Sequence, residues 1–190
     1  GKAWILLDWK IEVIEPVKMG EELKVETWIE PLKSPFGTIR SFLGYAGDKL
    51  CAKGITKWVL LDVTTGRPSK IEADLIERYT VNEGSAFEGS KIEKIAEPEN
   101  YTAETEILVR RTDIDWNNHV HNLTYLDYAL DCLPEDVYTS KNFKKVRITF
   151  KHEITGRKII KGKYGETENA SVVAIYNEKG DLCTLVEFKE

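Results

Sequence analysis

Apolar and polar residues alternate along the first third of the chain, the pattern of a β-sheet that is buried on one face. The alternation is clearest over residues 23–29, where Leu, Val, Thr and Ile alternate with Lys, Glu and Trp. Two further strands are predicted over residues 36–45 and 49–63, with turns at residues 46–48 and 64–68. This part of the chain therefore predicts a meander of antiparallel strands.

A different pattern appears over residues 120–133, where apolar side chains cover most of the circumference of a predicted helix. Asn117 or Asn118 is expected to cap its start and Pro134 to end it. Its polar residues form one narrow stripe, namely Thr124, Asp127 and Asp131. Because so little of its surface is polar, we expect other elements to wrap this helix.

Strand patterns flank the helix, beginning with one over residues 105–111. The strands predicted after the helix cover residues 146–154, 157–164, 171–176 and 182–188. The second half therefore predicts one buried helix with a long antiparallel sheet.

Residues 82–100 are polar and lack periodicity, which is typical of a connector between domains. We therefore predict an N-terminal domain over residues 1–81, a linker over residues 82–103 and a C-terminal domain over residues 104–190.

A weak internal repeat relates the two halves. Tyr45, Gly47-Asp48 and Leu50-Cys51 recur as Tyr176, Gly180-Asp181 and Leu182-Cys183, and Gly20 corresponds to Gly156. The same offset places the first-half counterparts of the strand and helix at residues 105–133 at or before Gly1, where the given sequence starts. We therefore expect the first unit to lack its own N-terminal strand and helix.

Composition narrows the possible classes of protein. The chain has 190 residues, of which 42% are apolar and 31% charged, as in a folded globular protein. Its longest apolar runs are far shorter than the roughly 20 residues of a membrane-spanning helix. The net charge of −5 argues against a nucleic-acid binder with a broad basic surface. Three cysteines without a Cys-x-x-Cys spacing indicate a reducing compartment, and we expect a cytoplasmic protein of bacterial type.

Carboxylate, amide and imidazole groups gather in the loop before the predicted helix, over residues 111–122. Asp115 or His119 could activate a water molecule, and Asn117 could hold that water or a carbonyl group. The N–H groups at the start of the helix would favour a developing oxyanion there. The structural alternative is that the asparagines only cap the helix and that Asp113 pairs with Arg110 or Arg111.

Other chemistry is less well supported by the sequence. No spacing around His119, His121 and His152 matches a familiar metal site, so we predict no metal and no cofactor. Cys51, Cys132 and Cys183 are expected to be inert packing residues. A short basic run, formed by Lys141, Lys144, Lys145 and Arg147, is a solvated strand edge or a contact for an acidic partner.

The loop over residues 115–120, Asp-Trp-Asn-Asn-His-Val, resembles the signature of the acyl-(acyl carrier protein) thioesterases. The resemblance extends to the opening Trp-Ile-Leu-Leu strand, to residues 20–28 and to residues 58–68, and so covers nearly the whole chain. It implies an α+β fold of two tandem hotdog units, in which an antiparallel sheet wraps a central helix.

The resemblance also implies a function and a site. Asp115, Asn117 and His119 would form the active site together with Glu153, and some plant members carry Cys where this chain has Ile154. The implied reaction is hydrolysis of fatty acyl thioesters of acyl carrier protein, which ends fatty acid synthesis. The alternatives are an acyl-coenzyme A thioesterase and a non-catalytic acyl-binding protein. Pairing with a second copy of the chain is left open.

One conflict accompanies this assignment. Strict alternation over residues 146–154 would place Glu153 on the polar face of its strand, together with Arg147, Thr149 and Lys151. A bulge, or a site between the two halves, would be needed to bring Glu153 to the other residues.

Overall fold

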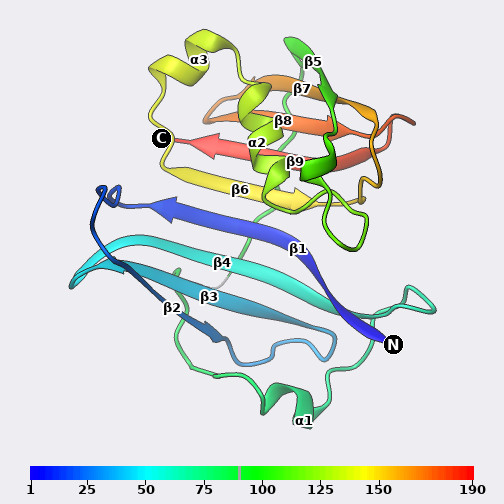
Figure 1. Ribbon diagram of the computed structural model, residues 1–190. Coiled ribbons are helices and arrows are strands. Elements are labelled where there is room, and N and C mark those ends of the chain that lie inside the picture. Colours follow the sequence, from blue (N-terminus) through cyan, green and yellow to red (C-terminus); the bar gives the residue numbers. More distant parts are fainter. Residues whose placement is uncertain (90) are drawn as a thin grey trace. The chain divides into compact units, whose positions relative to one another are not determined.

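The computed structural model describes residues 1–89 and 91–190, and the chain divides into two compact units, Gly1–Glu93 and Lys94–Glu190 (Figure 1). The first unit contains antiparallel strands in the order β2-β3-β4-β1. Their bounds are β1 (Lys2–Val13), β2 (Leu23–Ile29), β3 (Gly37–Ala46) and β4 (Lys49–Asp62). The predicted meander is therefore confirmed.

The chain returns across this sheet after the short helix α1 (Ala73–Ile76). The indole of Trp28 donates a hydrogen bond to the Gly84 carbonyl oxygen at 2.7 Å. The Ala86 N–H donates to the Ser41 hydroxyl at 3.0 Å, and that hydroxyl donates to the buried Glu30 carboxylate at 2.8 Å. The segment after α1 thus covers one face of the first sheet.

The second unit contains antiparallel strands in the order β6-β9-β8-β7-β5, and helix α2 packs against β8 and β9 (Figure 1). The helices are α2 (Thr124–Asp131) and α3 (Glu135–Ser140), preceded by the 3₁₀ turn Arg111–Asp113. The strands are β5 (Ala103–Leu108), β6 (Lys145–Phe150), β7 (Ile159–Thr167), β8 (Ala170–Tyr176) and β9 (Leu182–Lys189). One helix packed on an antiparallel sheet is the arrangement that the sequence predicts here.

The helix itself is shorter than predicted, and its capping was wrongly assigned. Helix α2 begins after Leu123, which offers no side-chain cap. Val120 instead pairs with Ile114 in a β-bridge, and its N–H donates to the Ile154 carbonyl at 2.8 Å. Because these backbone groups are engaged in extended pairing, Asn117 and Asn118 lie in a turn well before the helix. The helix ends at Asp131, and Pro134 begins α3 instead.

The internal repeat is visible in the structure. The hairpins β3–β4 and β8–β9 both contain a register shift, at Gly44/Tyr45 and at Ile175/Tyr176. In each hairpin a buried cysteine, Cys51 or Cys183, donates its thiol to the carbonyl two residues earlier. Gly20 and Gly156 both adopt positive φ, 89° and 67°, before the second strand of each repeat. No counterparts of β5 and α2 occur among residues 1–89.

Candidate active site

A tight turn over residues 115–119 holds three of the predicted site residues together. The Asp115 Oδ1 atom accepts hydrogen bonds from the N–H groups of Asn117, at 2.9 Å, and His119, at 3.1 Å. The Asp115 N–H in turn donates to the His119 carbonyl at 2.8 Å. Asn118 closes the turn with a φ of +64°, a conformation that Asn tolerates better than most residues. The Asp115 carboxylate therefore organises the loop that presents Asn117 and His119.

These contacts also determine the protonation of Asp115. Partial burial raises the pKa of this carboxyl group, but the N–H groups of His119 and Asn117 outweigh that effect and hold it below its usual value. Asp115 is therefore fully ionised at neutral pH. With Oδ1 shared between two N–H donors, Asp115 is a weak base.

The fourth predicted residue, Glu153, lies beside His119. Its Oε2 atom is 3.4 Å from His119 Nε2, and the side chains are 67% and 39% exposed, respectively. The backbone of His119 forms a β-bridge with Thr155, and the backbone of Val120 bonds to Ile154. The loop after β6 is thus held against the turn that carries His119, with an imidazole and a carboxylate facing each other at a solvent-accessible position.

The structure removes the conflict over the orientation of Glu153 without a bulge. Strand β6 ends at Phe150, three residues before Glu153, so the predicted strand over residues 146–154 is too long. Because Glu153 follows the strand, its direction is independent of the alternation that governs Arg147 and Thr149. The direction of Glu153 is instead set by the backbone hydrogen bond between its neighbour Ile154 and Val120.

Helix α2 contacts the site through two tyrosines, neither of which was predicted to be functional. The Tyr125 hydroxyl accepts a hydrogen bond from the Ile154 N–H at 3.1 Å. The Tyr128 hydroxyl donates to Asp113 Oδ2 at 2.7 Å. Both rings are buried, and burial raises the pKa of both hydroxyls, so each remains protonated. Two tyrosines within a buried helix were a usable signal, because buried hydroxyls need partners.

Asp113 anchors the start of the loop. Its carboxylate is 3% exposed and accepts hydrogen bonds from the Arg110 N–H at 2.7 Å and from Arg110 Nε at 3.0 Å. Burial raises the pKa of Asp113, but the bonds from Arg110 and Tyr128 outweigh burial and lower it. The predicted pairing of Asp113 with Arg110 is therefore confirmed, and it coexists with the turn around Asp115.

The remaining candidates do not join this cluster. His121 Nδ1 accepts the Leu123 N–H at 3.3 Å. Within residues 1–89 and 91–190 no three His, Cys, Asp or Glu side chains are grouped as a metal site. Burial raises the pKa of Cys132 and of Cys183 to about 11, which disfavours a thiolate nucleophile at either position.

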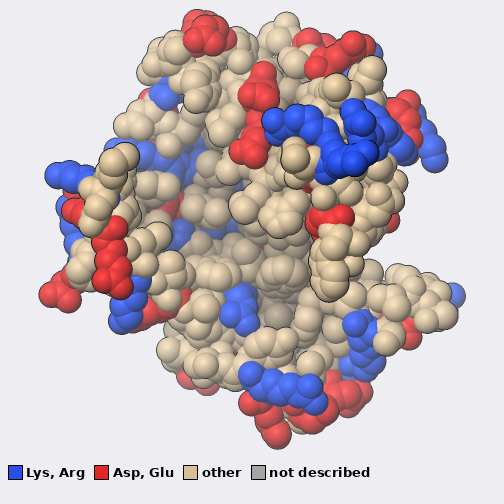
Figure 2. All heavy atoms as spheres, viewed as in Figure 1, with Lys and Arg blue, Asp and Glu red and all other residues tan. Residues whose placement is uncertain are grey.

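Much of the predicted basic run is paired within the unit. Lys141 Nζ lies 2.6 Å from a Glu166 oxygen, and the largely buried Arg147 lies 2.6 Å from Glu187. Lys145 Nζ donates to the Glu190 carbonyl oxygen at 3.4 Å. On the face that Figure 2 shows, Lys and Arg are interspersed with Asp and Glu. The run therefore offers less free positive charge than its sequence indicates.

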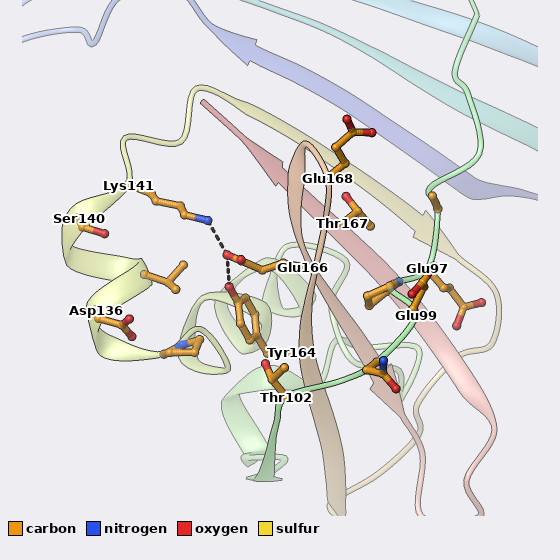
Figure 3. A pocket seen from close by; sticks show the side chains of 15 residues that line it. Glu97, Glu99, Thr102, Asp136, Ser140, Lys141, Tyr164, Glu166, Thr167 and Glu168 are labelled. Atoms are coloured by element: carbon orange, nitrogen blue, oxygen red, sulfur yellow. Dashed lines mark hydrogen bonds and ion pairs between the residues drawn. The ribbon is translucent and has the colours of Figure 1, made fainter.

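A pocket of about 930 Å³ lies elsewhere in the second unit, beyond the end of α2 (Figure 3). Its walls come from parts of residues 96–102, 134–141 and 164–168. Lys141 and the Tyr164 hydroxyl both bond to Glu166 within it. None of the four predicted site residues lines this pocket. The pocket includes Pro134, which follows α2, whereas His119 precedes the helix. The pocket is therefore separate from the His119–Glu153 pair.

No helix among the described residues is long and apolar enough to cross a membrane.

Comparison with solved structures shows the fold. The 12:0-ACP thioesterase from Umbellularia californica superposes with a TM-score of 0.87 at 18% identity, covering 99% of this chain and 75% of that one. An acyl-ACP thioesterase from Bacteroides thetaiotaomicron gives a TM-score of 0.82 at 22% identity, covering 99% and 76%. The chain therefore has the double-hotdog fold.

Sequence comparison agrees with this fold. The oleoyl-acyl carrier protein thioesterase 1 of Arabidopsis thaliana is 24% identical over 162 residues, which are 79% of this chain and 44% of that protein. The chain thus spans less than half the length of this relative. Residues 1–79 match the acyl-ACP thioesterase N-terminal domain, and residues 96–187 match the acyl-ACP thioesterase C-terminal domain. Since these two domains account for nearly all of the sequence, the chain belongs to the acyl-ACP thioesterase family.

Proposed function

We propose that this protein hydrolyses fatty acyl thioesters of acyl carrier protein, releasing a free fatty acid and the carrier protein. The observation that carries the proposal is the pairing of His119 Nε2 with Glu153 Oε2 at 3.4 Å, next to the turn that Asp115 organises. A carboxylate and an imidazole at this separation can exchange a proton, as thioester hydrolysis requires. The names of the relatives support the substrate class.

Glu153 is the better general base of the two carboxylates. Asp115 already accepts two N–H donors, which lower its pKa, whereas Glu153 is mostly exposed and faces His119. In the proposed reaction, Glu153 takes a proton from water as the water oxygen attacks the thioester carbon. His119 then passes this proton from Glu153 to the sulfur as the carbon–sulfur bond breaks. Asn117 steadies the carbonyl oxygen with its amide.

The start of α2 contributes less to this site than the sequence indicates. The N–H groups of Leu123 and Thr124 are already bonded to His121, and the helix begins five residues after His119. The proposed oxyanion contact therefore rests on Asn117 and the turn, and not on the end of the helix.

The substrate class is tested by comparing two thioesters of equal acyl chain length, one on acyl carrier protein and one on coenzyme A. We expect a kcat/KM at least about tenfold higher for the carrier protein substrate, because the carrier surface adds binding contacts. Equal values would favour an acyl-coenzyme A thioesterase. Binding of both thioesters without release of fatty acid would indicate a non-catalytic acyl-binding protein.

The cytoplasmic location expected from the sequence stays a prediction.

A further inference from the structure

The segment that carries Glu153 is attached to the rest of the unit through its neighbour, Ile154. The Ile154 side chain is 1% exposed. Its carbonyl oxygen accepts the Val120 N–H at 2.8 Å, and its N–H donates to the Tyr125 hydroxyl at 3.1 Å. The backbone of Ile154 is therefore held from two sides, by Val120 next to the turn over residues 115–119 and by Tyr125 in helix α2.

Tyr125 is itself fixed in place. Its ring meets Phe150, at the end of β6, edge to face with centroids 5.6 Å apart. It also meets Tyr128 at 6.4 Å, and Tyr128 bonds to Asp113 at the start of the loop. The hydroxyl that receives the Ile154 N–H thus comes from a rigid part of the core.

We infer that Tyr125 is a positioning residue, whose hydroxyl holds the Ile154 backbone so that the adjacent Glu153 faces His119. This inference rests on the proposed function, since it assigns a role to Tyr125 in the same site. It also gives position 154 a structural role, because its backbone bridges the helix and the turn while its side chain fills the core. Tyr125 acts through Ile154 and needs no contact with the substrate.

The test is Tyr125→Phe, which keeps the ring and removes only the hydroxyl. We expect kcat for the acyl carrier protein substrate to fall roughly 10- to 100-fold, because small misplacements of a reacting group are costly, with KM changed less than about twofold. Hydrogen exchange of the Ile154 amide should become at least about tenfold faster, because its buried acceptor is gone.

Tyr164→Phe is the matched control. Tyr164 is also buried, and its hydroxyl donates a hydrogen bond to Glu166 at 2.7 Å, in the pocket away from the site. We expect this variant to keep the wild-type kcat and the wild-type Ile154 exchange rate.

Three results would overturn the role of Tyr125: an unchanged kcat in Tyr125→Phe, a lower kcat with unchanged Ile154 exchange, or an equal loss of kcat in Tyr164→Phe. Glu153→Gln separates this failure from failure of the proposed function. If Glu153→Gln is inactive while Tyr125→Phe is normal, only the positioning role is lost. If Glu153→Gln keeps full activity, the proposed site itself is wrong.

Discussion

At the scale of single residues, the two carboxylates of the proposed site have different partners, and we propose different roles for them on that ground. The Asp115 carboxylate accepts hydrogen bonds from the backbone N–H groups of Asn117 and His119. These bonds hold the turn in shape and lower the pKa of Asp115. Glu153 has His119 as its neighbour and remains mostly exposed. Asp115, Asn117 and His119 could be singled out in the sequence by residue type and position. Glu153 was implied only by the family resemblance. The separate roles proposed for the two carboxylates could not be predicted from the sequence, because they depend on hydrogen bonds that form only when the turn folds.

The turn predicts a specific tolerance at Asn118, whose φ is +64°. Asn118→Gly should retain activity and stability, since Gly adopts this conformation freely. Asn118→Val should lower the free energy of unfolding by roughly 1–3 kcal/mol, because β-branched residues are strained there. Urea unfolding of both variants checks this prediction. Equal stability of the Val and Gly variants would contradict the observed backbone conformation.

At the scale of elements, strands were predictable to within a few residues, whereas the helix was not. The strands predicted over residues 23–29, 36–45 and 49–63 lie within one residue of β2, β3 and β4 at each end. The predicted buried face is wrong at the start of β2, however, where Leu23 is 50% and Val25 is 55% exposed. The apolar run over residues 120–133 was assigned to one helix, although Val120 belongs to a β-bridge and only Thr124–Asp131 is helical. Periodicity cannot separate a buried turn from a buried helix, since both are apolar.

The packing of α2 on the sheet predicts a tight contact at Gly162 in β7. A Cβ atom at this position would overlap Cys132 Sγ and approach Ile107 Cδ1 to 3.3 Å. Gly162→Ala should therefore destabilise the protein by about 1–3 kcal/mol through overpacking. Adding Cys132→Ala should recover part of that loss, which a double-mutant cycle by thermal or urea unfolding measures. Strict additivity of the two changes would argue against the contact.

At the scale of the whole molecule, the repeat was the most informative signal in the sequence. It predicted matching hairpins, and the structure shows that both the register shifts and the cysteine contacts recur. What the repeat could not reveal is the set of buried charges that the second unit tolerates. Asp113 is paired with Arg110, and Glu187 with Arg147. The first pair is local and could be predicted from the sequence, whereas Arg147 and Glu187 are 40 residues apart and are brought together only in the folded structure.

These buried carboxylates predict how stability depends on pH. Burial raises the pKa of Asp113 and of Glu187, but their hydrogen-bonded arginines outweigh burial, so both pKa values are lowered on folding. Their contribution is therefore complete above the unfolded pKa values of roughly 4 and is lost as the pH falls through the folded values.

The free energy of unfolding in urea should thus decrease as the pH drops below about 4. Asp113→Asn should cost roughly 1.5–3 kcal/mol at pH 7, because it removes a charged partner of Arg110 and Tyr128. The variant should also lose less stability than the wild type on acidification, since one linked carboxylate is gone. An identical acid slope in both proteins would show that Asp113 is not part of this linkage.

The central claim is that Glu153 and His119 together hydrolyse the acyl thioester, and Glu153→Gln tests it most directly. The variant keeps the shape of the side chain and removes its ability to take a proton. Fatty acid released from acyl carrier protein should be quantified for both proteins under the same conditions. We predict that the wild type releases fatty acid and that kcat falls roughly 10²- to 10⁴-fold in Glu153→Gln, with the fold intact. Equal rates of release from the two proteins would contradict the claim.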